Sequence, residues 1–342
     1  MNPGLSFPFR KAGGLGLGCL LLLFTLAVGA WSQSEQPPSP TPQTPAAPST
    51  EQPATPPEEP QEPASTIPLP PQQMVLVKGR KIVYYEQGQG SVVILLHGLG
   101  ADSHHWAANI GPLSSNFHVI ALDQIGYGKS DKPVMRYTVG NFAEYLYGFM
   151  EALNIPKATL VGNSLGGWIA LDFSIHHPDR VDKLVLVDAA GLHPASPLRM
   201  PKGGWKDLTP LNTHWFFDLM EANKAWATTD LGPHSFERHV KNGDSYTVAS
   251  SVAEMSTGRE FEDKKLDRVQ TPTLILWGRD DMLIPLAMGE HFNKGIAGSQ
   301  LIVIEGTGHI PMVGKPDEFN QLVQRFLTAA PPTKAVTASA GT

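Results

Sequence analysis

Cysteine is nearly absent from this chain, which holds a single one, Cys19, in an apolar stretch near the N-terminus. The rest of the sequence therefore has no disulfide bond and no cysteine metal site. A chain of this length does not need such cross-links, because a core of roughly 260 residues buries enough surface to be stable. Excess positive charge is absent as well. The net charge is −6, and nothing in the sequence indicates a nucleic-acid surface.

Lysine and arginine are missing from residues 12–77, a span that contains two different segments. The first follows Arg10 and Lys11, is apolar and rich in leucine, and ends in small residues that permit cleavage after Ala30. If it is not cleaved, its length of about 20 residues suffices to span a bilayer. We therefore assign residues 1–31 to a signal peptide or membrane anchor. We expect a protein that is periplasmic, secreted or tethered to the outer face of the cytoplasmic membrane.

The second segment, residues 32–71, is rich in proline. Fourteen of the chain's 31 prolines lie between Gln36 and Pro71, with Ser, Thr, Gln and Glu between them. Such a composition cannot bury enough apolar surface to fold, so we predict a disordered linker. It is either a spacer that holds a domain away from a membrane or wall, or a connection with no role of its own. The tail at residues 331–342 has a similar character.

Residues 72–330 show the pattern of an α/β domain. Two alternating stretches, Met74–Gly79 and Lys81–Gly88, predict an antiparallel hairpin joined by Gly79-Arg80. Helical stretches at Val139–Leu153 and Leu165–His177 lie among six short and almost continuously apolar runs, as expected of parallel strands covered on both faces. The six runs are residues 92–98, 117–123, 158–163, 183–188, 273–278 and 300–306.

The central motif is the turn Gly162-Asn163-Ser164-Leu165-Gly166, which follows the apolar run at 158–161 and precedes a helix. It matches the nucleophile elbow Gly-x-Ser-x-Gly in the context that this motif requires. Gly162 and Gly166 leave room for the neighbouring strand and helix, and the N–H of Leu165 would face an oxyanion beside Ser164. A glycine-rich turn with an incidental serine is the simpler alternative. The flanking strand and helix favour the nucleophile.

Ligands of parallel sheets gather at the carboxyl ends of strands, so the residues after the other apolar runs are informative. After the run at 92–96, the loop offers the backbone N–H of Leu99 as a second oxyanion donor. We interpret His97 in the same loop as a structural histidine. Asp123, after the run at 117–122, is interpreted as a residue that caps a turn.

The last two strand ends offer an acid and a base. Asp280 and Asp281 follow the run at 273–278, and one of them would orient a catalytic histidine. His309 follows the last run, in a loop whose glycines would bring it over Ser164. The order Ser, acid, His along the chain is a known arrangement of such residues. The other histidines have no comparable placement and are interpreted as surface or core residues.

About 80 residues separate two of the predicted strands, more than an ordinary connection needs. We predict a mostly helical cap at about residues 192–268, whose apolar side chains would exclude water and hold an apolar group of the substrate. Alternatively, most of these side chains form the core of the cap itself. They are Trp205, Trp215, Phe216, Phe217, Met220, Trp226 and Met255.

Taken together, five motifs resemble the α/β-hydrolase superfamily: GNSLGG, HGLG, DQIGYGKSDKP, LWGRDDMLIP and GTGHIPM. The resemblance covers roughly Met74–Phe326. It implies the α/β-hydrolase fold, with a mostly parallel eight-stranded sheet, helices on both faces and a helical cap. It also implies that Asp281 is the acid, by the spacing from the preceding glycine, and that Leu99 is an oxyanion donor. Locally, the elbow and the GRDD loop are most similar to meta-cleavage product hydrolases and small carboxylesterases.

The resemblance implies a serine hydrolase, esterase-like or lipase-like, that cleaves a small apolar carboxylic ester through an acyl-enzyme. Its catalytic residues would be Ser164, Asp281 and His309, with no cofactor and no metal. Three alternatives stay open: a C–C bond hydrolase of the meta-cleavage type, another serine hydrolase such as a thioesterase or prolyl aminopeptidase, and a non-catalytic ligand-binding protein. One departure weakens the first of these. The C–C hydrolases usually carry Trp directly after the catalytic His, where this chain has Ile310.

Overall fold

The computed structural model describes residues 67–193 and 242–329. The predicted signal peptide or anchor, most of the linker, the tail and most of the predicted cap lie outside these residues. Of the apolar cap side chains named above, Met255 lies within them. In the part of the chain that is described, no helix is both long enough and apolar enough to cross a membrane.

An eight-stranded sheet forms the centre of the described domain, in the order β1-β2-β4-β3-β5-β6-β7-β8. The first two strands run antiparallel to their neighbours, and the pairs from β4 to β8 are all parallel. The predicted mostly parallel eight-stranded sheet is therefore confirmed. The strands are β1 (Gln72–Val77), β2 (Arg80–Gln87), β3 (Val92–Leu96), β4 (His118–Leu122), β5 (Ala158–Asn163), β6 (Val181–Val187), β7 (Thr273–Gly278) and β8 (Gln300–Ile304).

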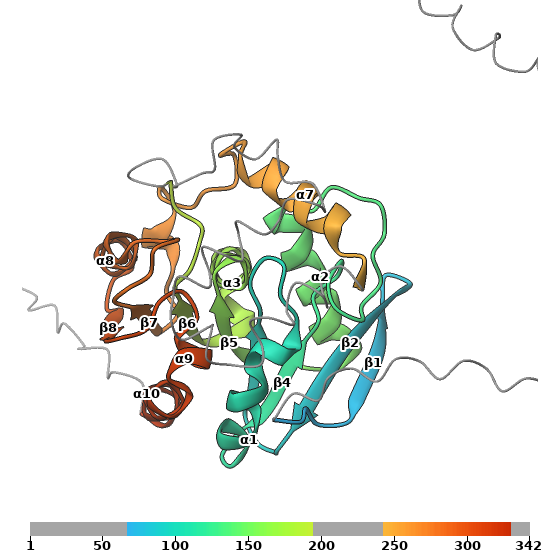
Figure 1. Ribbon diagram of the computed structural model, residues 1–342, viewed down its shortest axis with the longest axis horizontal. Helices are drawn as coiled ribbons and strands as arrows, with labels where there is room; N and C mark the ends of the chain where they lie inside the picture. The colour runs from blue at the N-terminus through green and yellow to red at the C-terminus, as the bar shows by residue number, and fades with distance from the viewer. Residues whose placement is uncertain (1–66, 194–241, 330–342) are drawn as a thin grey trace, which may run out of the picture. The chain divides into compact units, whose positions relative to one another are not determined.

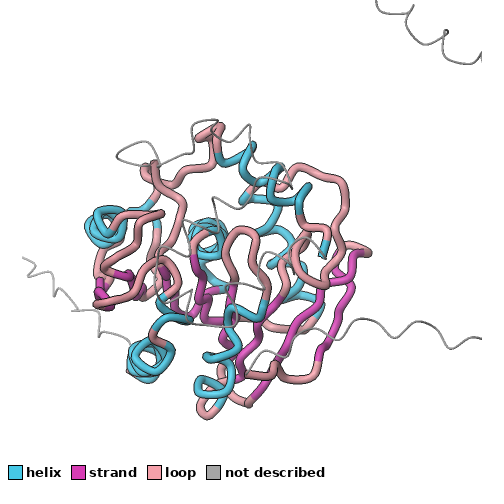
Figure 2. The backbone as a smooth tube through the Cα atoms, in the orientation of Figure 1, coloured by secondary structure: helices cyan, strands magenta, loops and turns pink. Residues whose placement is uncertain are grey.

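Helices cover both faces of the sheet (Figures 1 and 2). Side chains of α2, α3 and α8 join one buried apolar cluster, and side chains of α1, α9 and α10 join a second on the opposite face. The strand β3 is apolar throughout because its side chains are buried on both faces. Ile94 and Leu96 belong to the first cluster, and Val93 and Leu95 belong to the second. The helices are α1 (Ala107–Ser114), α2 (Val139–Ala152), α3 (Leu165–His176), α7 (Ser245–Met255), α8 (Leu286–Gly295), α9 (Pro311–Gly314) and α10 (Pro316–Thr328).

The predicted turn of the hairpin is wrong by one residue. Lys78 and Gly79, rather than Gly79 and Arg80, connect β1 and β2, and Arg80 already pairs with Val77. Both turn residues have positive φ, 51° and 73°, as the two central residues of a type I′ turn require. A glycine is favoured in such a turn but does not show which of its two positions it occupies.

The order in which the chain adds strands to the sheet reverses at β3, which lies between β4 and β5. The chain passes from β3 through α1 to β4 on one side, then returns through α2 to β5 on the other. Leu96 at the end of β3 pairs with Gly162 near the end of β5, so the loops that follow these strands begin side by side. Such a switch point is where open α/β sheets bind their ligands.

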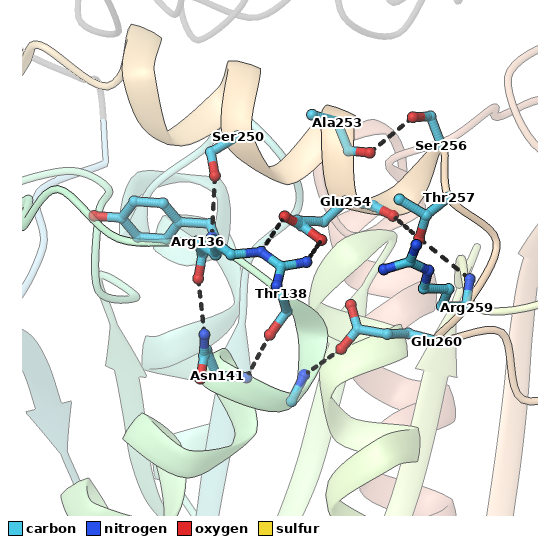
Figure 3. A network of polar contacts seen from close by, with 12 residues as sticks. Arg136, Thr138, Asn141, Ser250, Ala253, Glu254, Ser256, Thr257, Arg259 and Glu260 are labelled. Atoms are coloured by element: carbon cyan, nitrogen blue, oxygen red, sulfur yellow. Dashed lines mark hydrogen bonds and ion pairs between the residues drawn. The ribbon is translucent and has the colours of Figure 1, made fainter.

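The helix α7 lies within the span predicted for the cap and is tied to the segment before α2 (Figure 3). Arg136 donates two hydrogen bonds of 2.7 Å to Glu254 of α7, and Ser250 accepts one from the N–H of Tyr137. The segment after α7 places Glu260 at the start of α2, where its carboxylate accepts the N–H groups of residues 139 and 140. Because the first N–H groups of a helix have no partner within the helix, Glu260 satisfies two of them.

Candidate active site

Ser164 occupies a strained corner between β5 and α3. It has φ 53° and ψ −116°, a backbone conformation that costs about 1–3 kcal/mol for a residue other than glycine. The corner holds because the N–H of Ser164 donates to Val187 and its carbonyl accepts from Trp168 and Ala190. A side chain at Gly162 would overlap the backbone of Gly166. The sharp turn thus keeps Ser164 at the carboxyl end of an interior strand, where the residue is partly exposed.

The loop after β3 lies against Ser164. A Cβ atom added to Gly98 would stand 3.2 Å from the Cβ of Ser164, so the backbone of this loop reaches the serine. Leu99 follows directly, and Leu165 is the first residue of α3. Of the two predicted oxyanion donors, Leu99 thus lies in the loop next to Ser164, and Leu165 lies at the start of the helix that follows it.

His97, in the same loop, is fully buried and structural, as predicted. Its Nδ1 donates to the carbonyl of Gly98 over 2.8 Å, and its Nε2 accepts the N–H of Gln124 over 3.1 Å. Both ring nitrogens are therefore engaged with the backbone. Burial lowers the pKa of the imidazole, which favours this neutral form.

Asp123 also has the structural role that the sequence predicts. One carboxylate oxygen accepts the N–H and the hydroxyl of Ser103, and the other accepts the N–H of Lys129. The side chain thereby connects the loops that follow β3 and β4. Burial, which outweighs these hydrogen bonds, raises its pKa above the ordinary value.

His309 and Asp281 form a buried pair. The Nδ1 of His309 lies 2.7 Å from Oδ2 of Asp281, and the two side chains are 2% and 0% exposed. The other carboxylate oxygen accepts the N–H groups of Leu283 and Ile284 over 2.8 and 2.9 Å. The carboxylate is thus held from both ends, and the distance to the imidazole is that of a charge-assisted hydrogen bond.

The loop that carries His309 is anchored beside the serine. Asn163, the residue before Ser164, donates from its side chain to the carbonyl of His309 over 2.9 Å and to that of Val187. This contact joins positions 146 residues apart in sequence. It shows how the elbow motif itself fixes the place of the histidine, a role that the sequence analysis did not assign to Asn163.

The two neighbouring aspartates differ in their surroundings. Asp281 is buried against His309, whereas Asp280 is exposed and its backbone N–H donates to the carbonyl of Thr307. Of the two acids that the sequence left open, the structure therefore brings Asp281 into contact with the imidazole.

A third acid, Asp188, belongs to the same cluster and was missed by the sequence analysis. It follows β6 directly, is fully buried, and forms a group with Asp281 and His309 in which one polar atom of each side chain lies within 4.8 Å of the other two. Burial, and secondarily the charge of Asp281, raise its pKa well above the usual value. The available signal was an acidic residue placed directly after a buried strand.

The cluster also has the residue types of a metal site. However, two ligands held about 2.1 Å from one tetrahedral zinc ion would lie about 3.4 Å apart. The contact of 2.7 Å between His309 and Asp281 is shorter and fits a shared proton.

Comparison with known proteins agrees with this geometry. The family model described as alpha/beta hydrolase fold matches residues 91–316. The chain therefore belongs to the α/β-hydrolase fold family, as its motifs predict, and is a hydrolase.

Two relatives cleave related compounds, according to their names. The 2-hydroxy-6-oxo-6-phenylhexa-2,4-dienoate hydrolase of Comamonas testosteroni is 34% identical over 264 residues, which are 72% of this chain and 91% of that protein. The 2-hydroxy-6-oxononadienedioate/2-hydroxy-6-oxononatrienedioate hydrolase of Escherichia coli O81 is 35% identical over 269 residues, which are 74% of this chain and 93% of that one.

Solved structures are similar as well. A meta-cleavage product hydrolase from Pseudomonas fluorescens superimposes with a TM-score of 0.67 at 28% identity, covering 75% of this chain and 97% of that chain. A membrane phospholipase A, described as a bacterial virulence factor, gives a TM-score of 0.66 at 30% identity, covering 75% and 85%. A meta-cleavage product hydrolase and a membrane phospholipase A thus both have structures similar to this chain.

Proposed function

We propose that this protein is a serine hydrolase that cleaves carboxylic esters, with Ser164 as nucleophile, His309 as general base and Asp281 as the acid that orients it. The observation that carries the proposal is the buried His309–Asp281 pair, held beside the strained Ser164 by Asn163. A serine, a base in reach of it and a third group that orients the base are the requirements of this chemistry.

The hydrogen bond to Asp281 decides which nitrogen of His309 acts. Because Nδ1 carries the proton and donates a hydrogen bond to the carboxylate, the neutral imidazole has its lone pair on Nε2. In the proposed first step, Nε2 takes the proton of Ser164 as the serine oxygen attacks the ester carbonyl carbon. The imidazolium then passes that proton to the departing alcohol, and an acyl-enzyme remains.

The backbone N–H groups of Leu165 and Leu99 are proposed to stabilise the oxyanion of the tetrahedral intermediate. Leu165 begins α3, so its N–H belongs to the unpaired first turn of a helix. Each such donor is typically worth about 3 kcal/mol of transition-state stabilisation. Water that gives its proton to His309 then attacks the acyl-enzyme. The acid is released, Ser164 regains its proton, and no cofactor or metal takes part in the proposed cycle.

The strongest alternative is hydrolysis of a C–C bond in a meta-cleavage product. It is favoured by the names of the relatives at 34% and 35% identity. Ester hydrolysis is supported by Ile310, a buried side chain at the position where those hydrolases usually carry Trp. It is also supported by the similarity to a phospholipase structure. Both reactions need the same serine, base and oxyanion donors, so the substrate distinguishes them.

We expect short- to medium-chain esters to be hydrolysed faster than a dienoic meta-cleavage product. An apolar pocket distinguishes one methylene from the next by only about 1–3 kcal/mol, so several acyl lengths should be accepted. The measurement is kcat/KM of the purified protein for p-nitrophenyl esters of increasing chain length and for the dienoate. If the dienoate is turned over more than about tenfold faster than every ester, a difference of about 1.4 kcal/mol, the C–C reaction replaces the ester reaction.

We further propose that the domain works outside the cytoplasm, either released or tethered through its N-terminal segment. The basic pair Arg10-Lys11, the apolar stretch and the proline-rich linker motivate this. Cell fractionation and N-terminal sequencing give the test. A new N-terminus after Ala30 is expected for a signal peptide, and a membrane fraction that retains Met1 for an anchor. A soluble cytoplasmic protein that begins at Met1 contradicts export.

A further inference from the structure

The side chain of Asp188 is not used by the mechanism proposed above, yet it lies beside the residues that are. It is 0% exposed, and its Oδ1 accepts the N–H of Gly278 over 2.9 Å. Among the described residues, its Oδ2 has no N–H or hydroxyl donor. In the described part of the chain, the carboxylate of Asp281 and the imidazole of His309 lie near Asp188, with one polar atom of each residue within 4.8 Å of the others. The contact with the Asp281 carboxylate raises the pKa of Asp188.

We propose that Asp188 is a positioning residue that stays protonated and donates a hydrogen bond from its carboxylic acid to the carboxylate of Asp281. The inference rests on the proposed function, in which Asp281 orients His309. In this arrangement the acid cluster carries one negative charge, located on Asp281. Every polar atom of the two aspartates then has a partner.

The place of Asp188 in the sheet and its backbone conformation both support a functional role for this residue. Asp188 stands where β6 ends between β5 and β7, the strands that lead to Ser164 and Asp281. Its φ of 41° lies in the left-handed region, which aspartate tolerates better than most residues. Strained residues of this kind persist where the surroundings hold them, and they concentrate at functional sites.

Burial of two carboxyl groups in contact explains the protonation. An ionised Asp188 would place a second negative charge in the interior, where residues 67–193 and 242–329 provide a single backbone N–H, that of Gly278, to stabilise it. The groups that face Asp188 are Asp281 from the loop after β7 and His309 from the loop after β8. Desolvation and the neighbouring carboxylate both raise the pKa of Asp188, which keeps the acid neutral.

A neutral Asp188 matters for the base. The single negative charge of Asp281 stabilises the imidazolium that forms when His309 takes the proton of Ser164. A second negative charge on Asp188 would stabilise that cation further and would oppose transfer of the proton to the departing alcohol. The hydrogen bond also adds a third fixed contact to Asp281, besides those from Leu283 and Ile284 and from His309.

The test compares Asp188→Asn and Asp188→Ala with the wild-type protein. Asparagine keeps the shape, accepts from Gly278 and donates to Asp281, so it replaces the neutral acid without a titrating proton. We expect Asp188→Asn to react with a fluorophosphonate and with p-nitrophenyl esters at nearly wild-type rates. The acidic limb of its pH–rate profile should be unchanged. Asp188→Ala frees Asp281 to move and should lower kcat by roughly 100-fold, with little change in KM.

An acidic limb that moves down by about 1 pH unit or more in Asp188→Asn would show that the wild-type residue is ionised, and would overturn the proposal. Equal rates for Asp188→Ala and wild type would also overturn it, since no positioning would then be lost. Thermal unfolding of both variants shows whether each is folded. If both are folded, a rate that alanine loses and asparagine restores reflects a loss of positioning.

Infrared spectroscopy tests the protonation without using activity. The difference spectrum between wild type and Asp188→Asn at pH 8 should contain the carbonyl stretch of a protonated carboxylic acid, since other buried acids contribute equally to both proteins and cancel. Absence of this band overturns the inference about Asp188. A wild-type protein that neither hydrolyses any substrate nor reacts with the fluorophosphonate contradicts the proposed function instead, whichever result the infrared spectrum gives.

Discussion

Replacing Ser164 with alanine is expected to abolish turnover while leaving the fold intact. Loss of the nucleophile costs roughly 10⁶-fold in kcat in the best-studied serine hydrolase. The backbone of residue 164 keeps its hydrogen bonds with Val187, Trp168 and Ala190, and alanine has no more difficulty than serine with its positive φ. The measurement is kcat on the best substrate of the panel, with circular dichroism to verify folding.

A serine in α3, the helix that follows Ser164, provides the matched control. Ser174 is fully buried, and its hydroxyl donates to the carbonyl of Ala170 over 2.8 Å, within the helix. Ser174→Ala therefore removes a hydroxyl from the helix next to Ser164 without touching the site, and it should retain wild-type kcat. Hydrolysis by Ser164→Ala at a rate near that of this control would rule out the proposed nucleophile.

Replacing Asp281 with asparagine is expected to lower kcat by roughly 10⁴-fold, as in the serine proteases. The amide oxygen can still accept the N–H groups of Leu283 and Ile284, so the loop keeps its form. The amide nitrogen then faces Nδ1 of His309 as a donor. This stabilises the tautomer with its proton on Nε2, which cannot accept the proton of Ser164.

Asp280→Asn makes the same chemical change one residue away and serves as the control. Asp280 is exposed, so its replacement should leave kcat close to that of the wild type. Measuring both variants at the same pH decides between the neighbours. Severe impairment of Asp280→Asn with a nearly normal Asp281→Asn would move the assignment by one residue.

Much of the fold follows from the sequence because its parallel strands are covered on both faces. Burial on two sides makes all residues of a strand such as β3 apolar, a pattern that is visible without a structure. The predicted helices Val139–Leu153 and Leu165–His177 each end one residue beyond the observed α2 and α3. The elbow was recognisable for a steric reason, since Gly162 and Gly166 stand where a side chain would meet backbone.

What escaped prediction depends on the spatial order of strands. Asp188 gains its meaning from β6 lying between β5 and β7, an order that a list of apolar runs does not contain. The choice between Asp280 and Asp281 was predicted from the spacing in the resembling family, and the residues by themselves left it open. The direction of the loop backbone decides which one is buried against His309. The role of Asn163 depends on a contact with a loop far along the chain.

The contact of Glu260 with the start of α2 bears on how far the cap is a separate module. This carboxylate, which follows α7, supplies two acceptors that α2 lacks in its own sequence, across about 120 residues of chain. The span predicted as the cap therefore finishes a helix of the hydrolase core. A cap taken from another family member would leave these two N–H groups without this acceptor unless it returned one to the same place. Exchange of substrate specificity by cap transfer would therefore also have to preserve this contact at the base of the cap.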